Sequence, residues 1–342
     1  MATISLKCYN KFVTDYKNLI QTLKNYEAFL GDLLENESLA PKTTFKIGGR
    51  ARLYIEPENF YSFQIALREI IRQKIKFFIL GGGSNVVFPD SDLDYIVLST
   101  RAFSNVDRLK HDELPLDFEK ITLAKDQVLI TCFSGTPVAT LVNYCTEHSI
   151  SGVEQFAGLP GSVGGAVYMN ARCFDKSISD IIYYTTYMDL SDEKITLHHD
   201  LFNKDEWDYK KSPFQNQNKF ITTATFLLTQ KSEKERPHIE SECKKYIAER
   251  VSKGHFKYPS AGSVFKNNRA FKKPSGQIID EAGLRGYTIG GAKIADFHGN
   301  FIVNVNNAKA SDVFDLVKYI QKEVQNKYDF LLEPEIIFVD KK

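Results

Sequence analysis

Between residues 51 and 85 the sequence alternates between strand and helix patterns and then runs into three consecutive glycines. Apolar residues predict a strand at ARLYI (51–55), an amphipathic helix at 58–73 and a strand at KFFIL (76–80), which leads into LGGGSN (80–85). We therefore expect a β-α-β unit with a glycine turn. Three successive glycines let backbone N–H groups converge on an anion, although LGGGSN has neither the phosphate-loop spacing nor the G-x-G-x-x-G spacing.

A second glycine-rich stretch, FAGLPGSVGGAVYMNA, occupies residues 156–171. Its glycines surround a fixed proline and leave an extended segment with little side-chain bulk. Such a segment suits either a flat or phosphorylated ligand or a close crossing of two chain segments, and the sequence leaves both open. Two such loops in neighbouring units favour one shared ligand.

The length of 342 residues exceeds the usual size of a single core, so we expect two or three domains. The segment 104–120 is charged and carries a proline, which predicts a solvated excursion between strands. Thr136 is predicted to cap a helix whose first position is Pro137. The other predicted elements are a helix within 12–30, strands at 95–99, 127–135, 181–190 and 219–229, a mostly helical bridge at 232–254, a helix at 311–328 and a strand at 335–339.

Charge and cysteine content limit the classes of partner. The 44 Lys and Arg residues balance the 43 Asp and Glu residues, so we expect no nucleic acid or membrane partner, and any anion site must be local. Five scattered cysteines without a C-x-x-C pair suggest neither a disulfide framework nor a zinc site. Adjacent His198 and His199 would face opposite ways on a strand, so we expect no metal. The sequence shows no apolar signal core and no run of about 20 apolar residues, which predicts a cytoplasmic protein.

One serine stands in an unusual context. In PSAGSVFKN (259–267), Ser263 follows Gly262 and precedes Val264 and Phe265. Glycine adopts dihedrals that other residues resist, so it can aim the next hydroxyl inward, where that hydroxyl would serve as a proton donor. A turn serine that bonds its own backbone is the commoner explanation of a lone Gly-Ser pair. The local pattern leaves both open.

Six motifs in series give the chain a family resemblance. They are TTFKIGG (43–49), LGGGSN (80–85), GLPGSVGGAVYMNA (158–171), PSAGSVFKN (259–267), GQIIDEAGL with IGGAKI (276–294) and LEPEIIF (332–338). Together they resemble the UDP-N-acetylenolpyruvoylglucosamine reductase family, FAD enzymes that make UDP-N-acetylmuramate for bacterial peptidoglycan.

The resemblance implies an α+β fold of three domains. The first two, over 1–100 and 101–235, would form a vanillyl-alcohol-oxidase-type FAD-binding fold. The third, over 236–342, would be an α+β substrate-binding domain. FAD is the implied cofactor, and NADPH is the implied co-substrate. The residues implied to hold FAD are Thr44, Gly81, Gly82, Gly83, Ser84, Asn85, Gly158, Pro160, Gly161, Ser162, Gly164, Gly165 and Val167.

The implied reaction adds a hydride and a proton across the enol-ether C=C of UDP-N-acetylglucosamine enolpyruvate, after NADPH has reduced FAD. Negative charge then spreads toward the substrate carboxylate and needs cationic or hydrogen-bonding partners. By the match to the family motifs, Ser263 is the proton donor, a neutral hydroxyl that avoids repulsion with that carboxylate. Glu335 would lie beside the carboxylate and orient or protonate it. A surface carboxylate is the alternative for Glu335, but Pro334 before it and the apolar IIFV after it favour the mouth of a buried strand.

The third implied catalytic group is a cation in a Tyr-Arg-x-Ser element. Here the residues are Tyr209, Lys210, Lys211 and Ser212, so Lys210 takes that role with a mobile point charge in place of a planar fork. The implied substrate-side residues are Tyr209, Arg250, Tyr258, Asn267 and His298, with Lys253 as an alternative to Arg250 at the diphosphate. Packing, a turn and a satisfied core histidine are the alternatives for Tyr258, Asn267 and His298.

Two departures from the family pattern stand out. No long insertion separates Lys210 from Ser263, so the chain resembles the branch that lacks a substrate-capping tyrosine loop. NARCFD (170–175) stands where the family shows Asn-Ala-Gly-Ala-Tyr-Gly, so Arg172 and Phe174 add bulk near the expected flavin edge.

Two rival hypotheses remain. One is a flavin oxidase of the same superfamily, and the other is a sugar-nucleotide-binding protein without turnover, which the lysine at position 210 motivates. On the main hypothesis the partners are the sugar nucleotide and NADPH, and the protein is a monomer.

Overall fold

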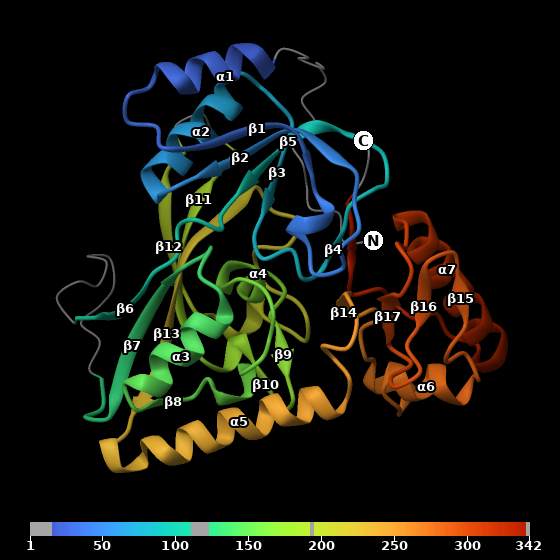
Figure 1. Ribbon diagram of the computed structural model, residues 1–342. Coiled ribbons are helices and arrows are strands. Elements are labelled where there is room, and N and C mark those ends of the chain that lie inside the picture. The colour runs from blue at the N-terminus through green and yellow to red at the C-terminus, as the bar shows by residue number, and fades with distance from the viewer. Residues whose placement is uncertain (1–15, 111–122, 192–194, 340–342) are drawn as a thin grey trace.

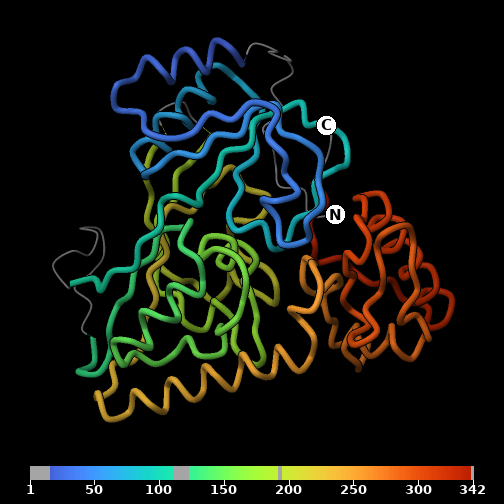
Figure 2. The backbone as a smooth tube through the Cα atoms, viewed as in Figure 1, coloured from blue at the N-terminus to red at the C-terminus, as the bar shows by residue number. Residues whose placement is uncertain are grey.

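The computed structural model describes residues 16–110, 123–191 and 195–339. The chain forms three bodies that follow one another along the sequence, and the third lies beside the other two (Figure 1). The backbone tube in Figure 2 shows the long helix near residue 240 running along the second body before the chain enters the third.

The first body is a four-stranded sheet packed against two helices. Its strand order is β1 (Gly31–Ser38), β2 (Arg50–Pro57), β5 (Leu93–Ser99) and β3 (Phe77–Leu80), with β2 and β3 both parallel to β5. The helix α2 (Phe60–Arg72) begins after Asn59, whose side chain accepts a hydrogen bond from the N–H of Ser62. The helix α1 (Tyr16–Asn25) buries Leu19 and Leu23 in the same core. The predicted β-α-β unit is confirmed, with β5 inserted between its two strands.

The second body is an antiparallel sheet. Its strand order is β12 (Leu197–Leu201), β11 (Ile182–Asp189), β13 (Lys219–Gln230), β7 (Gln127–Phe133) and β6 (Val106–Leu109), and β8 (Ile150–Ser151) pairs with the end of β13. The helices α3 (Val138–Glu147) and α4 (Val163–Tyr168) contribute to its hydrophobic core. The predicted strands at 127–135, 181–190 and 219–229 are confirmed.

Two local predictions in this region are wrong. Strand β6 occupies part of the segment 104–120, because Val106 is buried and pairs with Cys132 of β7; residues 111–120 lie outside the described residues. The helix α3 begins at Val138 with Pro137 as its N-cap. Thr136 does not cap it, because its hydroxyl donates to the backbone oxygen of Asn105.

The helix α5 (Arg236–Ser252) packs on the second body (Figure 1). Its Ile239 and Cys243 lie in the same hydrophobic core as Phe156 and Leu228. The boundary at residue 235 that the sequence predicts would therefore separate α5 from the second body, although α5 helps to fill the core of that body.

The third body is a small sheet with strand order β14 (Ser260–Ser263), β17 (Phe301–Asn304), β16 (Ala292–Ile294) and β15 (Thr288–Ile289), packed against α6 (Ser275–Glu281) and α7 (Ala310–Tyr328). The chain then returns to the first body, where β18 (Ile337–Phe338) pairs in parallel with β4 (Val86–Val87). The remaining elements are the hairpin of β9 (Arg172–Cys173) with β10 (Lys176–Ser177) and the 3-10 helices at Ala40–Lys42, Glu154–Phe156, Ile178–Asp180, Lys204–Glu206, Glu233–Glu235 and Arg269–Phe271.

Candidate functional site

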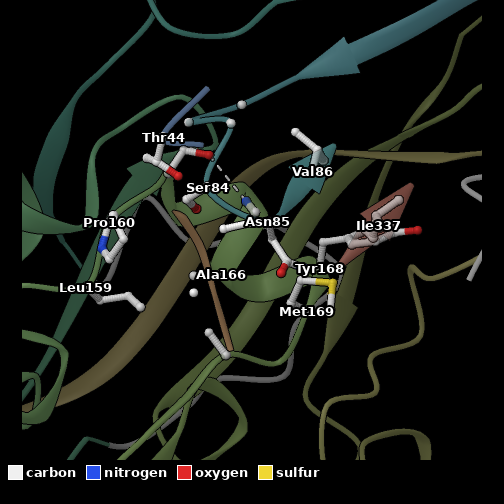
Figure 3. Close-up of a pocket in the computed structure, with 18 of the residues that line it drawn as sticks. Thr44, Ser84, Asn85, Val86, Leu159, Pro160, Ala166, Tyr168, Met169 and Ile337 are labelled. Carbon is white, nitrogen blue, oxygen red and sulfur yellow. Dashed lines mark hydrogen bonds between the residues drawn. The ribbon is translucent and has the colours of Figure 1, made fainter. Parts of the chain in front are cut away.

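One large cleft is lined by all three bodies. Its volume is about 1060 Å³, and its wall includes both glycine-rich loops, the start of β13 and the segment around β14. Typical ligand pockets occupy roughly 300–1,000 Å³, so this cleft has room for a large cofactor and part of a second ligand. Figure 3 shows one part of the wall, where the labelled residues are Thr44, Ser84, Asn85, Val86, Leu159, Pro160, Ala166, Tyr168, Met169 and Ile337.

The two glycine-rich loops cross at this wall. A Cβ atom built on Gly82 would lie 2.5 Å from the Cα atom of Gly161, and one on Gly81 would lie 2.5 Å from the Ser162 Oγ atom. Only glycine lets two backbones approach this closely. The interpretation of the second loop as a close crossing of two chain segments is therefore confirmed, and the crossing also lines the cleft.

Most residues predicted to hold the cofactor are brought together. The cleft wall includes Thr44, Gly81, Gly82, Gly83, Ser84, Asn85, Gly158, Pro160, Ser162, Gly164 and Gly165. Gly161 is not part of the wall and packs behind Gly82 and Ser84. Val167 is also absent from the wall. It is fully buried in the second body's core, because α4 directs Val163 and Val167, four residues apart, to the same face.

Ser263 ends β14 and lies on the cleft wall. Gly262 before it has a φ of 78° and sits in a register irregularity between β14 and β17. A bulge of this kind re-aims the side chain that follows, and the positive φ favours glycine. Within the described residues the Ser263 hydroxyl makes no bond to its own backbone, so the self-bonded turn serine does not describe this residue.

Glu335 reaches the same cleft from the far end of the chain. Its backbone N–H donates to the oxygen of Val264 (2.7 Å), the residue after Ser263. Its backbone oxygen accepts from the Asn85 side-chain amide (3.1 Å) in the first glycine loop. Its Oε1 atom lies 2.5 Å from the Lys210 Nζ atom, and the two side chains are only 11% and 12% exposed. A carboxylate and an ammonium from distant segments thus form a nearly buried ion pair close to Ser263.

Lys210 is held in a strained turn. Its φ is 57°, and the backbones of Asp208 and Lys211 on either side exchange two hydrogen bonds. A positive φ costs a non-glycine residue about 1–2 kcal/mol and is often found where function needs a particular side-chain direction. Next to it, the Tyr209 hydroxyl accepts a hydrogen bond from the backbone N–H of Asn267 (3.4 Å). Two predicted substrate-side residues therefore contact each other, and the turn bridges the second and third bodies.

The other predicted substrate-side residues also line the cleft. Arg250 is 8% exposed and donates through Nε to the oxygen of Ala157 (2.9 Å), so it braces the second glycine loop. Tyr258 is 44% exposed and free to contact a ligand. The His298 Nδ1 atom accepts a hydrogen bond from the N–H of Asn300 (3.1 Å), and burial lowers the pKa of His298, so its ring is neutral near pH 7.

The cleft is basic although the chain is nearly neutral. Its cationic lining residues are Arg172, Lys210, Lys219, Arg250, Lys253 and Lys257, and Glu335 is the single Asp or Glu among the described residues of the wall. A cleft lined by one sign of charge focuses the field and attracts ions of the opposite sign. The predicted local anion site fits this wall. No sequence motif marked Lys219 or Lys257, because one begins a strand and the other lies in an exposed loop.

Beyond the glycine loops, the cleft continues between apolar side chains. Phe77, Ile79, Leu190 and Phe220 line this part, together with Gln217 and Asn218. Bare glycine backbone suits phosphate groups, and an apolar wall with a few polar groups suits a heterocyclic ring. The residues present therefore fit FAD.

Comparisons with known proteins agree with this geometry. Residues 254–339 match the family model "UDP-N-acetylenolpyruvoylglucosamine reductase, C-terminal domain", and residues 51–196 match "FAD binding domain". The chain is 39% identical to the UDP-N-acetylenolpyruvoylglucosamine reductase of Treponema denticola, over 94% of this chain and 98% of that one. It is 37% identical to the enzyme of the same name from Borreliella burgdorferi, over 93% and 98% of the two chains.

A solved structure is similar over nearly the whole chain. The crystal structure of UDP-N-acetylenolpyruvylglucosamine reductase from Thermus caldophilus aligns with a TM-score of 0.65 at 27% identity, covering 91% of this chain and 100% of that one. The match of residues 254–339 to the reductase C-terminal domain favours the reductase over the oxidase hypothesis.

Within residues 16–110, 123–191 and 195–339, no helix combines the length and the apolar character needed to cross a bilayer. Over the same ranges, no group of three or more His, Cys, Asp and Glu side chains is placed to hold a metal ion.

Proposed function

The chain belongs to the UDP-N-acetylenolpyruvoylglucosamine reductase family, and from that premise we propose which of its residues carry out the reaction. The activity is the FAD-mediated, NADPH-dependent reduction of the enolpyruvyl group of UDP-N-acetylglucosamine enolpyruvate, which gives UDP-N-acetylmuramate for peptidoglycan synthesis. When bound, FAD accepts a hydride from NADPH and supplies it to the substrate double bond.

Ser263 is the proton donor in our proposal. The α carbon of the substrate must receive a proton, and a neutral hydroxyl can approach the neighbouring carboxylate without like-charge repulsion. The bulge at Gly262 and the position of Ser263 on the cleft wall support this role. Because its hydroxyl is not tied to its own backbone, it is available to a ligand.

Lys210, oriented by Glu335, stabilises the negative charge that develops on the substrate carboxylate. The Lys210 ammonium is the cation nearest to Glu335, and the low exposure of both side chains strengthens their electrostatic interaction. Glu335 fixes the ammonium direction, and Lys210 presents its remaining N–H donors to the substrate carboxylate. A preorganised cation of this kind stabilises developing charge without reorganisation during the reaction.

The eleven wall residues given above, from Thr44 to Gly165, are the proposed FAD contacts, with Gly161 supporting them from behind. Tyr209, Tyr258, Asn267 and His298 are the proposed substrate contacts, and Arg250 acts by bracing the second glycine loop. Val167 contributes by packing α4 into the second body's core and not by contacting the cofactor with its side chain.

The domain organisation is also part of the proposal. We place the first boundary near residue 100 and the second near residue 253, since α5 shares the second body's core. We also propose that the protein acts as a monomer, since all three bodies of a single chain contribute to the wall of the cleft. A cytoplasmic location is consistent with the buried free thiols of Cys132, Cys145, Cys173 and Cys243.

One observation carries the proposal: Ser263, Glu335 and Lys210 line the same cleft as the two glycine loops. An anaerobic two-step experiment tests it. NADPH should bleach the flavin absorbance of the purified protein, and enolpyruvyl-UDP-N-acetylglucosamine should restore it without oxygen. Bleaching without restoration by this substrate would contradict the proposed function.

A further inference from the structure

The cations of the cleft differ in whether they are already paired. Lys210 pairs with Glu335, Lys219 with Asp200 (3.5 Å) and Lys253 with Glu249 (2.5 Å). The Arg250 guanidinium donates hydrogen bonds to the backbone oxygens of Ala157 and Gln155. Among the described residues of the cleft wall, Arg172 and Lys257 are the cations with neither an acidic partner nor a side-chain bond to a backbone oxygen.

Arg172 has no acidic partner among the described residues, but its side chain is held in place. It belongs to the hairpin of β9 and β10, and its Nη1 atom donates to the hydroxyl of Ser177 (3.0 Å) across the hairpin. Ser177 is itself 6% exposed, and its hydroxyl also caps the 3-10 helix Ile178–Asp180. One nitrogen of the guanidinium is thereby anchored, while the other donors of the planar fork stay available.

The acidic residues nearby do not neutralise Arg172. Asp180 accepts a hydrogen bond from the Ser177 backbone N–H (2.7 Å), and no ion pair joins it or Asp175 to Arg172. Both side chains are exposed, but Lys257 differs in having no anchoring side-chain contact of this kind within the described residues. An anchored fork loses less conformational freedom on binding than a mobile ammonium does, so it binds an oxyanion more effectively.

The hairpin also lies beside the catalytic turn. Asn170, two residues before Arg172, donates from its side chain to the backbone oxygen of Asp208 (2.8 Å), which precedes Tyr209 and Lys210. Arg172 is therefore on the part of the wall that leads to the Lys210–Glu335 pair.

We propose that Arg172 binds an oxyanion of the nucleotide ligands that enter this cleft, either a phosphate group of NADPH or an anionic group of the sugar nucleotide. This inference rests on the proposed function, since it takes NADPH and enolpyruvyl-UDP-N-acetylglucosamine as the ligands. It assigns to the chain a ligand contact at a position where the family pattern has glycine. Both ligands carry several oxyanions, and a bidentate guanidinium contact to one of them is a strong charge-assisted interaction.

The test compares Arg172→Gln, Arg172→Lys and Lys176→Gln as flavin-loaded proteins. Lys176 lies on the opposite strand of the same hairpin and does not line the cleft, so its substitution removes a charge without touching the proposed contact. Three arms are measured by rapid mixing: flavin reduction by NADPH, flavin reduction by NADH, and reoxidation by the sugar nucleotide, each over a range of ligand concentration. Melting temperatures confirm that the variants fold.

We expect Arg172→Gln to weaken apparent binding about tenfold or more in at least one arm, Arg172→Lys to weaken it less, and Lys176→Gln to leave it unchanged. A loss with NADPH alone places the 2′-phosphate at Arg172, and a loss with both NADPH and NADH places the diphosphate there. A loss confined to reoxidation places the sugar nucleotide there. Unchanged binding in all arms, or an equal loss in Lys176→Gln, would overturn the assignment. If the unsubstituted protein fails to react, the proposed function fails instead, which separates the two outcomes.

Discussion

The Lys210 Nζ atom lies 2.5 Å from the Glu335 Oε1 atom, although 125 positions separate the two residues in the sequence. The pair joins the second body to the segment that returns from the third body to the first. Since both side chains are close to 90% buried from solvent, the contact is more than an exposed surface pair, which would contribute little. This junction brings together the two charged groups to which we assign catalytic roles.

Lys210→Arg tests whether the cation at this position needs to be a lysine. The guanidinium keeps the charge and adds a planar fork for the substrate carboxylate, and arginine has the same backbone restrictions as lysine at the φ of 57°. We expect the turnover number to stay the same or to rise in steady-state assays. A loss of more than about tenfold with FAD still bound would show that the site requires the lysine ammonium itself and would contradict this expectation.

Glu335→Gln removes the negative charge but keeps the side-chain shape and one acceptor oxygen. We expect the rate of flavin reoxidation by substrate to fall by about tenfold or more, because Lys210 loses its charged partner and its direction. The matched control is Glu333→Gln. Glu333 also pairs with a lysine, Lys266, but its side chain is 69% exposed, so its substitution should change the rate little. Equal effects of the two substitutions would contradict the assigned role of Glu335.

We expect the partly buried His255 to make the free energy of unfolding of this protein depend on pH. Burial, together with the nearby positive charge of Arg250, lowers the pKa of His255 to about 4. Since the unfolded chain has the ordinary histidine pKa near 6.5, the unfolded state binds more protons between about pH 6.5 and pH 4. The contribution of neutral His255 to the free energy of unfolding is fully present above about pH 6.5. It is lost as the pH falls from about 6.5 to about 4.

His255→Phe keeps the ring stacked on Phe301, whose centroid lies 4.8 Å away, but removes the titrating group. In urea unfolding at about pH 7 and about pH 5, the free energy of unfolding should fall less in the variant than in the unsubstituted protein. An identical fall would show that other groups, such as His298, carry the dependence.

The strands and helices that could be predicted from the sequence are those whose own residues follow a regular apolar pattern. The strand, helix and strand of 51–80 follow apolar periodicity, and the structure confirms them as β2, α2 and β3. Strand β1, GDLLENES, was not predicted, because none of its residues is fully buried and its stability comes from pairing with β2. Likewise, the strand at Val106 was not predicted, because it depends on the long-range pairing of Val106 with Cys132.

The candidate site was predictable as a set of motifs but not as a geometry. Glycine-rich loops and the family resemblance placed Ser263, Glu335 and Lys210 in one site, and all three line one cleft. The contact of Tyr209 with Asn267 and the bracing role of Arg250 depend on long-range packing, which no local pattern encodes. Val167 was predicted as a cofactor contact because it follows the glycines of the second loop. The four-residue spacing from Val163, which places both side chains in the core, was not recognised as helical.

The most direct test of the account is the Ser263→Ala variant in anaerobic rapid mixing. Reduction of the bound flavin by NADPH should keep its normal rate, because the hydroxyl takes no part in that half-reaction. Reoxidation by enolpyruvyl-UDP-N-acetylglucosamine should slow by about 100-fold or more, as expected for the loss of a positioned proton donor. If both half-reactions proceed at the rates of the unsubstituted protein, Ser263 is not the donor and the proposed convergence of catalytic groups in this cleft is wrong.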